Sequence, residues 1–428
     1  MRKLLIGGAW VDSTSGEAIE VTDPATEEVL GAVPAGTPED VERAVAAARN
    51  AFPAWRELTA VERANVLHQA AARMRDHFDE LVRLLTLEEG KPVPENEEEI
   101  DWSLNTLDYY AELGRHTRGR VVPSPDAGQL SLVLKEPYGV VGCIVPWNYP
   151  VLLLAWKIAP ALAAGNTVVI KPSTLAPLTL LQMIEVAFDH FPPGVINVVT
   201  GRGSRVGDAL VTHPDVPVIA FTGSTAVGKL VSQACAPSFK HTNLEMGGKN
   251  AIMVMDDAKL DLAVEGAIWG GFGTTGQRCT AASRVIVHKK VIKEFTDKFV
   301  ARAKALKVGD GLDPSVEMGP SISEDQLNTV MEYVEIGKGE AKLLCGGNRL
   351  TSGDYAHGYF HEPTIFGDVD PQMRIAQEEI FGPVGAIIPC DSLEHAIQIN
   401  NGTIYGLSAS VYTQDVNKAF VAMRDAYT

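Results

Sequence analysis

Hydrophobic and polar residues alternate in short runs at the start of the chain, and turn-forming residues separate these runs. The pairs Gly7-Gly8, Asp12-Ser13 and Asp23-Pro24 mark turns, so this opening segment is predicted to form antiparallel hairpins. From Thr37 to Ala111 the pattern becomes helical. Thr37 is a suitable cap, and the proline and two acidic residues that follow it are typical of a first helical turn.

Farther along the chain, short β-branched runs alternate with helical stretches. The alternation is typical of parallel sheets with crossover helices, so the pattern predicts an α/β fold. At 428 residues the chain is long enough for two or more domains. The predicted strands are Val140–Val145, Thr167–Ile170, Ile196–Val199 and Val218–Phe221, followed by a second series at Ala251–Met255, Arg284–Val287 and Ala386–Pro389.

Two segments with unusual charge content refine this prediction. The charge run Glu95 to Glu99 is typical of a solvated helix face. Gly139 to Trp156 carries no charge, but Pro146 and Pro150 interrupt it, and a membrane span would have to hide the polar groups there. We therefore predict that this stretch is buried core and that the protein has no membrane partner.

The composition is that of a globular protein with an acidic balance. The net charge of -17 argues against nucleic acid or an anionic membrane surface as a partner. Five cysteines stand at positions 143, 235, 279, 345 and 390, never as a CxxC pair, so neither a disulfide framework nor a zinc site is predicted. The first apolar run is too short for a signal peptide, and we predict a cytoplasmic location.

Cys279 is the cysteine whose surroundings favour chemistry. It lies in the segment Gly273 to Thr280, among small residues and directly after Arg278. A structural cysteine usually packs among larger apolar residues, whereas a thiolate in this setting is both stabilised and reachable. Cys279 is therefore a candidate nucleophile.

Two glycine-rich junctions follow predicted strands. Gly201 to Gly207 is a variant of the dinucleotide fingerprint, and Gly223 to Lys229 is the second junction. Either can offer backbone N–H groups to a pyrophosphate, and either is explained as well by a plain turn. The second junction has the spacing of a P-loop, but Leu230 stands where that loop needs Ser or Thr to hold magnesium. Phosphoryl transfer is therefore disfavoured.

A pair of histidines with the spacing of metal ligands is also not expected to bind a metal ion in the predicted backbone. His357 and His361 have the i, i+4 spacing of a helical zinc pair, but Gly353, Gly358 and Pro363 break any helix there. In an extended chain four residues span about 13 Å, which is too far for two ligands of one ion. We predict no metal site.

Three further segments supply groups that a cysteine nucleophile needs. Glu245 lies in an apolar and then flexible setting, where burial would raise its pKa toward that of a general base. Asn148 stands at a strand end, where its amide can bind an oxyanion. Lys171 stands at another strand end, where open α/β sheets bind nucleotides. Taken singly, these are equally well a helix cap, a turn residue and a surface charge.

Together these segments make the sequence resemble the aldehyde dehydrogenase superfamily over almost the whole chain. The matching motifs occur in the family's order and are Pro146-Trp147-Asn148-Tyr149-Pro150, Lys171-Pro172-Ser173, Phe221-Thr222-Gly223-Ser224, Glu245-Met246-Gly247-Gly248-Lys249, Gly276-Gln277-Arg278-Cys279 and Glu378-Glu379-Ile380-Phe381-Gly382-Pro383. The resemblance implies a Rossmann-type cofactor domain, an α/β catalytic domain and a small β oligomerisation element. The corresponding ranges are 1–118 with 138–249, then 250–428, and the hairpin 119–137.

The resemblance also implies a mechanism. The Cys279 thiolate attacks an aldehyde carbonyl, and the oxyanion of the thiohemiacetal is held by the Asn148 side chain and the Cys279 N–H. Hydride then leaves for the nicotinamide of NAD or NADP, which gives a thioester. Glu245 activates the water that hydrolyses the thioester, and Lys157 helps to relay the proton.

The remaining site residues follow from the same resemblance. The cofactor contacts are expected at Ile144, Pro146, Trp147, Lys171, Ser173, Thr174, Gly223, Ser224, Glu379 and Phe381. Near the aldehyde tunnel we expect Tyr149, Leu153, Trp156, Arg278 and Thr280.

The sequence departs from the family pattern at two places. Many NAD-preferring relatives have Glu at the position of Thr174, where it binds the ribose 2′-hydroxyl, so threonine predicts dual use of NAD and NADP. The chain stops at Thr428, inside a helix predicted from Asp415, whereas relatives continue through segments that complete the tunnel and add a strand to the oligomerisation element. We interpret the sequence as part of a longer protein, and we predict a homodimer or homotetramer when that segment is present.

The leading hypothesis is thus an acid-forming, NAD(P)-dependent aldehyde dehydrogenase. Transfer of the acyl group to coenzyme A is disfavoured, because relatives that do so usually lack the glutamate found here at Glu245. A catalytically silent relative is the alternative from another class. The expected substrate is a medium-sized aliphatic or aromatic aldehyde, and a semialdehyde, helped by Arg278, is the second candidate.

Overall fold

The computed structural model describes all 428 residues. The chain divides into two compact units that each draw on more than one segment. Unit 1 comprises Met1–Thr22, Val29–Glu88 and Asn96–Glu245, and unit 2 comprises Asp23–Glu28, Glu89–Glu95 and Met246–Thr428. No helix has the length and apolar character needed to cross a lipid bilayer. The cytoplasmic location stays a prediction.

Unit 1 is built on a seven-stranded sheet in the order β11-β10-β7-β8-β9-β1-β2. The five strands from β11 to β9 run parallel, and the hairpin β1–β2 joins β9 antiparallel at the far edge. The strands are β1 (Leu4–Ile6), β2 (Ala9–Val11), β7 (Val140–Ile144), β8 (Thr167–Lys171), β9 (Ile196–Val198), β10 (Val218–Thr222) and β11 (His241–Glu245). These strands confirm the parallel sheet predicted from the alternating pattern.

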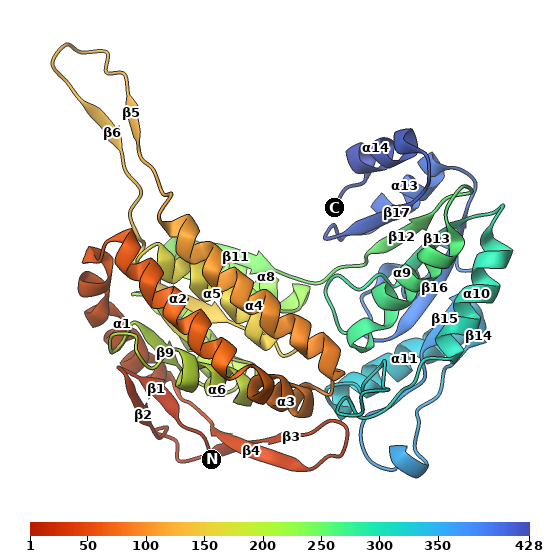
Figure 1. Ribbon diagram of the computed structural model, residues 1–428, viewed down its shortest axis with the longest axis horizontal. Coiled ribbons are helices and arrows are strands. Elements are labelled where there is room, and N and C mark those ends of the chain that lie inside the picture. The colour runs from red at the N-terminus through yellow and green to blue at the C-terminus, as the bar shows by residue number, and fades with distance from the viewer. The chain divides into compact units, whose positions relative to one another are not determined.

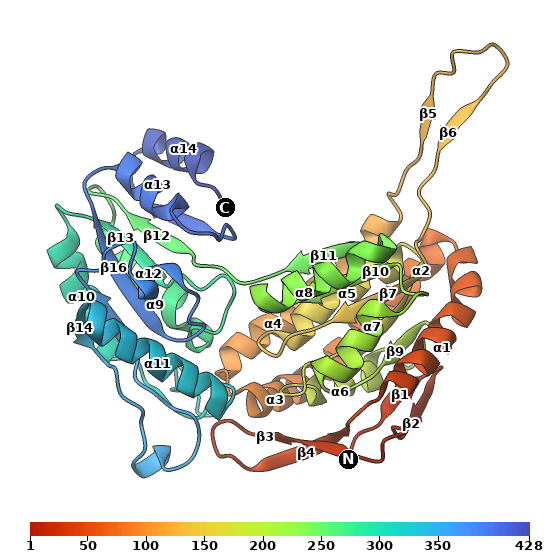
Figure 2. The same ribbon diagram turned by 180° about the vertical axis from the view of Figure 1, so that it is seen from behind.

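Helices cover both faces of this sheet. On one face α5 packs against β7 and β8, and α2 lies against both α5 and α6 (Figure 1). On the other face α1 packs against β7, β8 and β9, α8 packs against β11, and α7 contacts both of these helices (Figure 2). Figure 1 is seen from the side of α2 and α4, and Figure 2 from the side of α7 and α8. The helices are α1 (Pro38–Glu57), α2 (Ala60–Asp76), α3 (Phe78–Glu89), α4 (Val93–Gly114), α5 (Pro150–Ala163), α6 (Leu178–Ala187), α7 (Asp208–Thr212) and α8 (Thr225–Cys235).

Local sequence explains how the first elements begin. Gly7 and Gly8 both have positive φ, +63° and +84°, which glycine adopts without steric cost, and they close the β1–β2 hairpin. Thr37 caps α1 and forms a capping box with Asp40, as its sequence predicts. A second hairpin pairs β3 (Ala18–Thr22) with β4 (Val29–Pro34). The opening segment therefore forms the hairpins that its pattern predicts.

A long hairpin leaves the body of unit 1 after α4. It consists of β5 (Arg120–Val122) and β6 (Ser131–Val133), and every residue of the two strands is exposed. Figures 1 and 2 both show it projecting away from the helices. Several of its exposed residues are large and apolar, among them Val121 at 71%, Leu132 at 52% and Leu134 at 69%. Two isolated strands with apolar side chains on their surface are only marginally stable alone.

Unit 2 is built on a six-stranded sheet in the order β14-β15-β16-β13-β12-β17. All pairs are parallel except β14–β15. The strands are β12 (Ala251–Val254), β13 (Arg284–His288), β14 (Lys342–Cys345), β15 (Thr364–Gly367), β16 (Val384–Cys390) and β17 (Ala409–Tyr412). The helices are α9 (Leu260–Phe272), α10 (Ile292–Lys304), α11 (Glu324–Glu340), α12 (Arg374–Gln377), α13 (Leu393–Asn401) and α14 (Val416–Asp425).

The core of unit 2 lies on both faces of its sheet. One cluster packs α9 and α10 on the sheet through Phe272, Phe295 and Phe299, and it also contains Ala25 from the short N-terminal segment. The other cluster lies under α11 and α13 and includes Val334. Unit 2 therefore completes its core with residues from the beginning of the chain.

The expectation of a solvated face from Glu95 to Glu99 is wrong for three of its five residues. Glu97 and Glu98 are exposed, but Glu95, Asn96 and Glu99 are buried, with Glu99 fully inaccessible. The Glu99 carboxylate accepts hydrogen bonds from the N–H groups of Val151 and Leu152 at 2.9 and 3.1 Å, at the start of α5. A carboxylate at a helix N-terminus satisfies donors that have no partner within the helix, which is why Glu99 is inside.

Candidate active site

The carboxyl ends of the unit 1 strands form one candidate edge. From β7 the chain crosses to β8 on one side, while β10 lies on the other side of β7, so the strand order reverses between β7 and β10. Ligands of open α/β sheets bind outside the carboxyl ends of the strands at such a reversal. Ile144 ends β7, and the segment Pro146 to Asn148 follows it directly. Asn148 is buried, whereas Ile144, Pro146 and Trp147 are partly exposed.

The start of α8 offers backbone donors at the same edge. Gly223 follows β10, and Ser224 is the N-cap, accepting the Val227 N–H at 3.3 Å. A Cβ at Gly223 would lie 2.6 Å from the ring of Phe221, so a side chain at this position would clash with that ring. The exposed first turn of an 11-residue helix carries a partial positive charge and suits a pyrophosphate.

Lys171 ends β8 and is buried. Its ammonium donates a hydrogen bond to the Pro172 carbonyl at 2.9 Å, and burial lowers its pKa to about 8. The next two candidates, Ser173 and Thr174, are partly exposed. Position 174 therefore carries a hydroxyl and no carboxylate.

A buried lysine connects α5 to the ends of β10 and β11. Lys157 donates a hydrogen bond to the Thr222 hydroxyl at 2.6 Å, and Thr222 is paired in register with Glu245. Burial lowers the pKa of Lys157, while the charge of Glu245 opposes that shift. The sequence analysis pointed to Lys157 and Glu245 and quoted Thr222 within the motif Phe221 to Ser224, but it gave Thr222 no role, because a threonine at a strand end has no distinctive chemistry of its own.

The expectation that Glu245 is buried is wrong. It is the last residue of the edge strand β11, and its side chain is exposed. An apolar neighbourhood along the sequence did not produce a buried carboxylate, because β11 has a neighbour on only one side. Its backbone carbonyl accepts the Gly223 N–H at 3.1 Å, which ties the end of β11 to the glycine junction.

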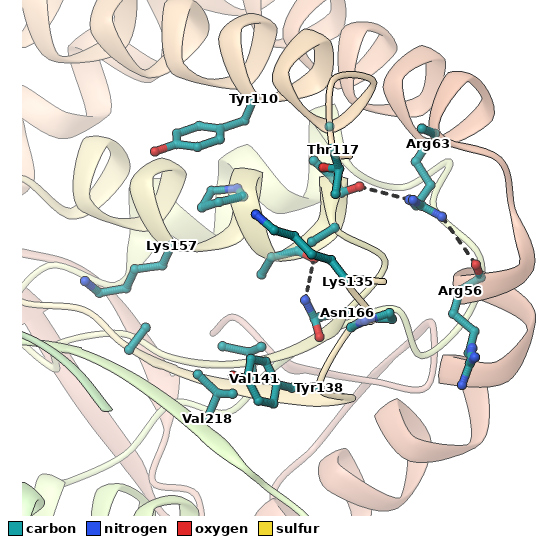
Figure 3. A pocket seen from close by; sticks show the side chains of 18 of the residues that line it. Arg56, Arg63, Tyr110, Thr117, Lys135, Tyr138, Val141, Lys157, Asn166 and Val218 are labelled. Atoms are coloured by element: carbon teal, nitrogen blue, oxygen red, sulfur yellow. Dashed lines mark hydrogen bonds between the residues drawn. The ribbon is translucent and has the colours of Figure 1, made fainter. Parts of the chain in front are cut away.

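An open pocket of about 1330 Å³ lies beside Lys157 and Glu245. Figure 3 shows the labelled side chains of Tyr110, Lys135 and Lys157 on its wall. Among the tunnel residues predicted in unit 1, Trp156 lines this pocket and is 52% exposed. Tyr149 and Leu153 are instead buried and do not line it.

In unit 2 the candidate residues gather at the amino ends of three neighbouring strands. Residues 246–250 precede β12, residues 273–283 precede β13, and residues 378–383 precede β16, and these strands pair in the order β16-β13-β12. The Glu379 carboxylate accepts the Gly248 N–H at 3.1 Å, and a Cβ at Gly247 would lie 1.9 Å from its Oε2. Burial raises the pKa of Glu379, and the Gly248 N–H and the Lys249 charge oppose this.

Cys279 lies in the loop before β13 and is the cysteine that burial does not shield. Its side chain is partly exposed, and its carbonyl accepts a hydrogen bond from the Asn250 amide at 2.7 Å. The other cysteines are buried, and burial raises the pKa of both Cys143 and Cys390 to about 12. No cysteine is in a disulfide bond.

The neighbours of Cys279 differ in exposure. The Arg278 guanidinium lies 4.4 Å from the Trp269 ring centroid and donates hydrogen bonds to the Trp269 and Gly270 carbonyls. Thr280 is exposed. Phe381 has a positive φ of +57°, and its carbonyl accepts a hydrogen bond from the side chain of Gln326 at 2.9 Å.

The candidates therefore form two groups, one in each unit. Unit 1 holds Ile144, Pro146, Trp147, Asn148, Tyr149, Leu153, Trp156, Lys157, Lys171, Ser173, Thr174, Gly223, Ser224 and Glu245. Unit 2 holds Arg278, Cys279, Thr280, Glu379 and Phe381.

Comparison with known proteins identifies relatives along nearly the whole chain. The family model described as the aldehyde dehydrogenase family matches residues 10–427. The chain is 46% identical over 417 residues to an α-ketoglutaric semialdehyde dehydrogenase of Bacillus subtilis, covering 96% of this chain and 85% of the relative. It is 44% identical over 424 residues to retinaldehyde dehydrogenase 3 of Mus musculus, covering 97% and 82%.

Solved structures give the same result. A crystal structure of betaine aldehyde dehydrogenase from Staphylococcus aureus in complex with NAD+ superposes with a TM-score of 0.97 at 38% identity. The match covers 99% of this chain and 85% of that one. The likeness extends to both sheets, because nearly every residue takes part in it.

Proposed function

Because the chain belongs to the aldehyde dehydrogenase family, we propose that it oxidises an aldehyde to the carboxylic acid with NAD or NADP, and that Cys279 is the nucleophile. One observation carries the proposal for this chain's own residues. Among its cysteines Cys279 alone is partly exposed. The loop that contains Cys279 lies next to the loops that contain Gly248 and Glu379. A reactive thiol must be accessible, and the buried cysteines are not.

The first step is covalent. The Cys279 sulfur forms a bond to the carbonyl carbon, and the carbonyl oxygen becomes an oxyanion. We assign the stabilisation of that oxyanion to the Cys279 backbone N–H and the Asn148 amide. The interaction of Asn250 with the Cys279 carbonyl supports this role of the backbone, because it fixes the orientation of the loop that carries the N–H.

The residues present fit a dinucleotide. The first turn of α8 would hold the pyrophosphate, Lys171 a ribose, and Glu379 the hydroxyls of the second ribose, because a carboxylate held by a backbone N–H is a preorganised acceptor. When bound, the nicotinamide accepts a hydride from the former carbonyl carbon. The remaining acyl group is then a thioester on Cys279.

Hydrolysis of the thioester requires a base. We assign this role to Glu245, whose exposed carboxylate can take a proton from water. Lys157 and Thr222 provide a polar path behind it, because the lysine donates to the threonine and the threonine pairs with Glu245 in register. The proton can therefore leave the reaction centre through groups of unit 1.

For the substrate we retain two candidates. A medium-sized aliphatic or aromatic aldehyde is consistent with Trp156 at the pocket wall. A semialdehyde is the second candidate, because the relative at 46% identity is an α-ketoglutaric semialdehyde dehydrogenase and the partly exposed Arg278 precedes the nucleophile. A guanidinium binds a carboxylate through two parallel hydrogen bonds, which an uncharged aldehyde cannot offer.

For assembly we propose a homodimer or homotetramer in which the β5–β6 hairpin contacts another subunit. Exposed apolar residues on both of its strands support this, because such a surface is stabilised when a partner covers it.

The proposed nucleophile is tested by alkylation. Purified protein is treated briefly with iodoacetamide, the labelled cysteine is located by mass spectrometry, and reduction of NAD or NADP is followed with a panel of aldehydes and semialdehydes. We expect label on Cys279 and a matching loss of activity, while Cys279→Ala is inactive and unlabelled. Cys390→Ala is the matched control, since Cys390 is buried in the same unit, and should keep the activity. Full activity after complete labelling of Cys279 would refute the proposal.

A further inference from the structure

Glu95 is a buried carboxylate with one partner residue in the loop that carries Cys279. It lies in the first turn of α4 and is 7% exposed. Its Oε1 accepts the Thr274 backbone N–H at 3.0 Å, and its Oε2 accepts the Thr274 hydroxyl at 2.7 Å. One carboxylate therefore fixes both the backbone and the side chain of Thr274, five residues before the nucleophile.

The backbone at this point is in an unfavourable conformation. Thr274 and Thr275 have φ of +52° and +55°, in the left-handed region that β-branched residues rarely occupy. Gly276 follows with φ of +66°, and a Cβ there would lie 2.3 Å from the Gly382 carbonyl oxygen. Such a run persists only where surrounding contacts hold it in place.

The contacts that hold the turn are specific. The Thr275 hydroxyl donates to the Gly319 carbonyl at 3.0 Å, and Gln277 accepts the Ile322 N–H at 3.0 Å. Among these contacts only the one from Glu95 brings a charge, and charge-assisted hydrogen bonds are the stronger ones. Burial raises the pKa of Glu95, whereas the two hydrogen bonds from Thr274 and the Arg278 and Lys91 charges favour its ionised form.

We propose that Glu95 is a positioning residue for Cys279: it holds the left-handed turn at Thr274 and so fixes the direction in which the loop delivers the Cys279 N–H and thiol. The inference rests on the proposed role of Cys279 as nucleophile. Without the Glu95 carboxylate, Thr274 loses the two hydrogen bonds to this charged acceptor, and the turn relaxes toward ordinary backbone angles. A misplacement of about 1 Å at a reacting group can reduce turnover by roughly 100-fold.

The chain offers a matched control for the loss of a buried carboxylate. Glu88 is fully buried in unit 1 and binds the N–H and hydroxyl of Thr179 at 2.9 and 2.7 Å, the same pair of groups on the same residue type. Glu88 is in α3, and its carboxylate also accepts the Leu178 N–H at the start of α6. These residues all belong to unit 1, whereas the Cys279 loop belongs to unit 2. Glu88→Gln therefore reproduces the structural loss without touching the turn.

The experiment compares full-length Glu95→Gln and Glu88→Gln by kcat, by KM for both substrates and by amide hydrogen exchange of the peptide spanning residues 273–279. We expect Glu95→Gln to lower kcat roughly 10- to 100-fold with KM for the cofactor unchanged, and to raise exchange in that peptide. Glu88→Gln should lower the melting temperature but keep kcat within about twofold.

A second pair of variants covers failure of Glu95→Gln to fold. Thr274→Ser keeps both donors and should retain kcat, whereas Thr274→Val loses the hydroxyl and should lower it about tenfold. The proposal is overturned if exchange of residues 273–279 is unchanged in Glu95→Gln, or if both glutamate variants lose kcat equally. Hydrogen exchange is independent of turnover, so it decides the role of Glu95 even if alkylation shows that Cys279 is not the nucleophile.

Discussion

Gly247→Ala should damage the cofactor site without unfolding the protein. The new Cβ would lie 1.9 Å from Glu379 Oε2 and 2.4 Å from its Cδ. A non-bonded contact needs about 3.5 Å, so the carboxylate must retreat by about 1.5 Å. The obstacle is the tip of a flexible side chain, and Gly247 is not among the positive-φ glycines, so the backbone accepts the alanine.

The size of the effect follows from what Glu379 gives up. Its hydrogen bond to the Gly248 N–H, 3.1 Å long, is lost when the carboxylate moves. A hydrogen bond to a charged group contributes about 1.5–3 kcal/mol, equivalent to roughly 10- to 100-fold in an equilibrium constant. We expect KM for NAD or NADP to rise by about that factor, while the melting temperature changes by only a few degrees.

The assay measures reduction of the nicotinamide at saturating aldehyde while the cofactor concentration is varied. Gly339→Ala is the matched control, because Gly339 lies in α11 with nothing within 4 Å of its added Cβ, and alanine there should stabilise the helix by about 0.5–1 kcal/mol. In the double variant Gly247→Ala with Glu379→Ala, no further loss is expected, because both changes remove the same group. An unchanged KM for the cofactor in Gly247→Ala would refute the assignment of Glu379 to the ribose.

Three more predictions follow from other parts of the chain. Burial lowers the pKa of His361 from 6.5 to about 4, so the folded protein is fully stabilised above pH 6.5 and loses about 3 kcal/mol of stability as the pH falls toward 4. The melting temperature of His361→Gln should therefore fall less over that pH range than that of the wild type, and an equal fall would contradict the role of His361. Thr174→Glu should lower kcat/KM for NADP relative to NAD at least tenfold, because a carboxylate repels the 2′-phosphate; an unchanged ratio places the 2′-position elsewhere. Val121→Asp and Leu132→Asp should shift the assembly toward monomer in light scattering without lowering the melting temperature of the subunit, and an unchanged mass would exclude the hairpin from the interface.

Local patterns in the sequence were sufficient to predict much of the fold. The strand β7, predicted as Val140–Val145, spans Val140–Ile144, and the helix predicted from Asp415 begins at Val416 with Asp415 as its cap. These elements depend on periodicity and on caps, which act within a few residues. The loop with Cys279 was noticed for the same reason, because its small residues are adjacent in sequence.

Side chains whose role depends on a distant partner were predicted poorly. A charge run gives no sign that Glu95 meets Thr274 or that Glu99 meets α5, although the i, i+4 spacing of the two glutamates does place them on one helix face. Thr222 gained significance only through its register with Glu245 and its contact with Lys157. Burial of Glu245 was predicted wrongly because the position of a strand at the sheet edge is decided by topology.

The inclusion of residues 23–28 in unit 2 has a consequence for the order in which the protein is made. Glu27 accepts the N–H of Gly358, which is synthesised 331 residues later. At about 5–20 residues per second, the early segment waits roughly 15–65 seconds for that partner on the ribosome. During this time Ala25 is exposed, and the apolar cluster to which it belongs cannot close. A fragment that begins at residue 246 would lack residues 23–28, which complete the core of unit 2. The carboxyl-terminal half should therefore require the rest of the chain, or a chaperone, to stay soluble.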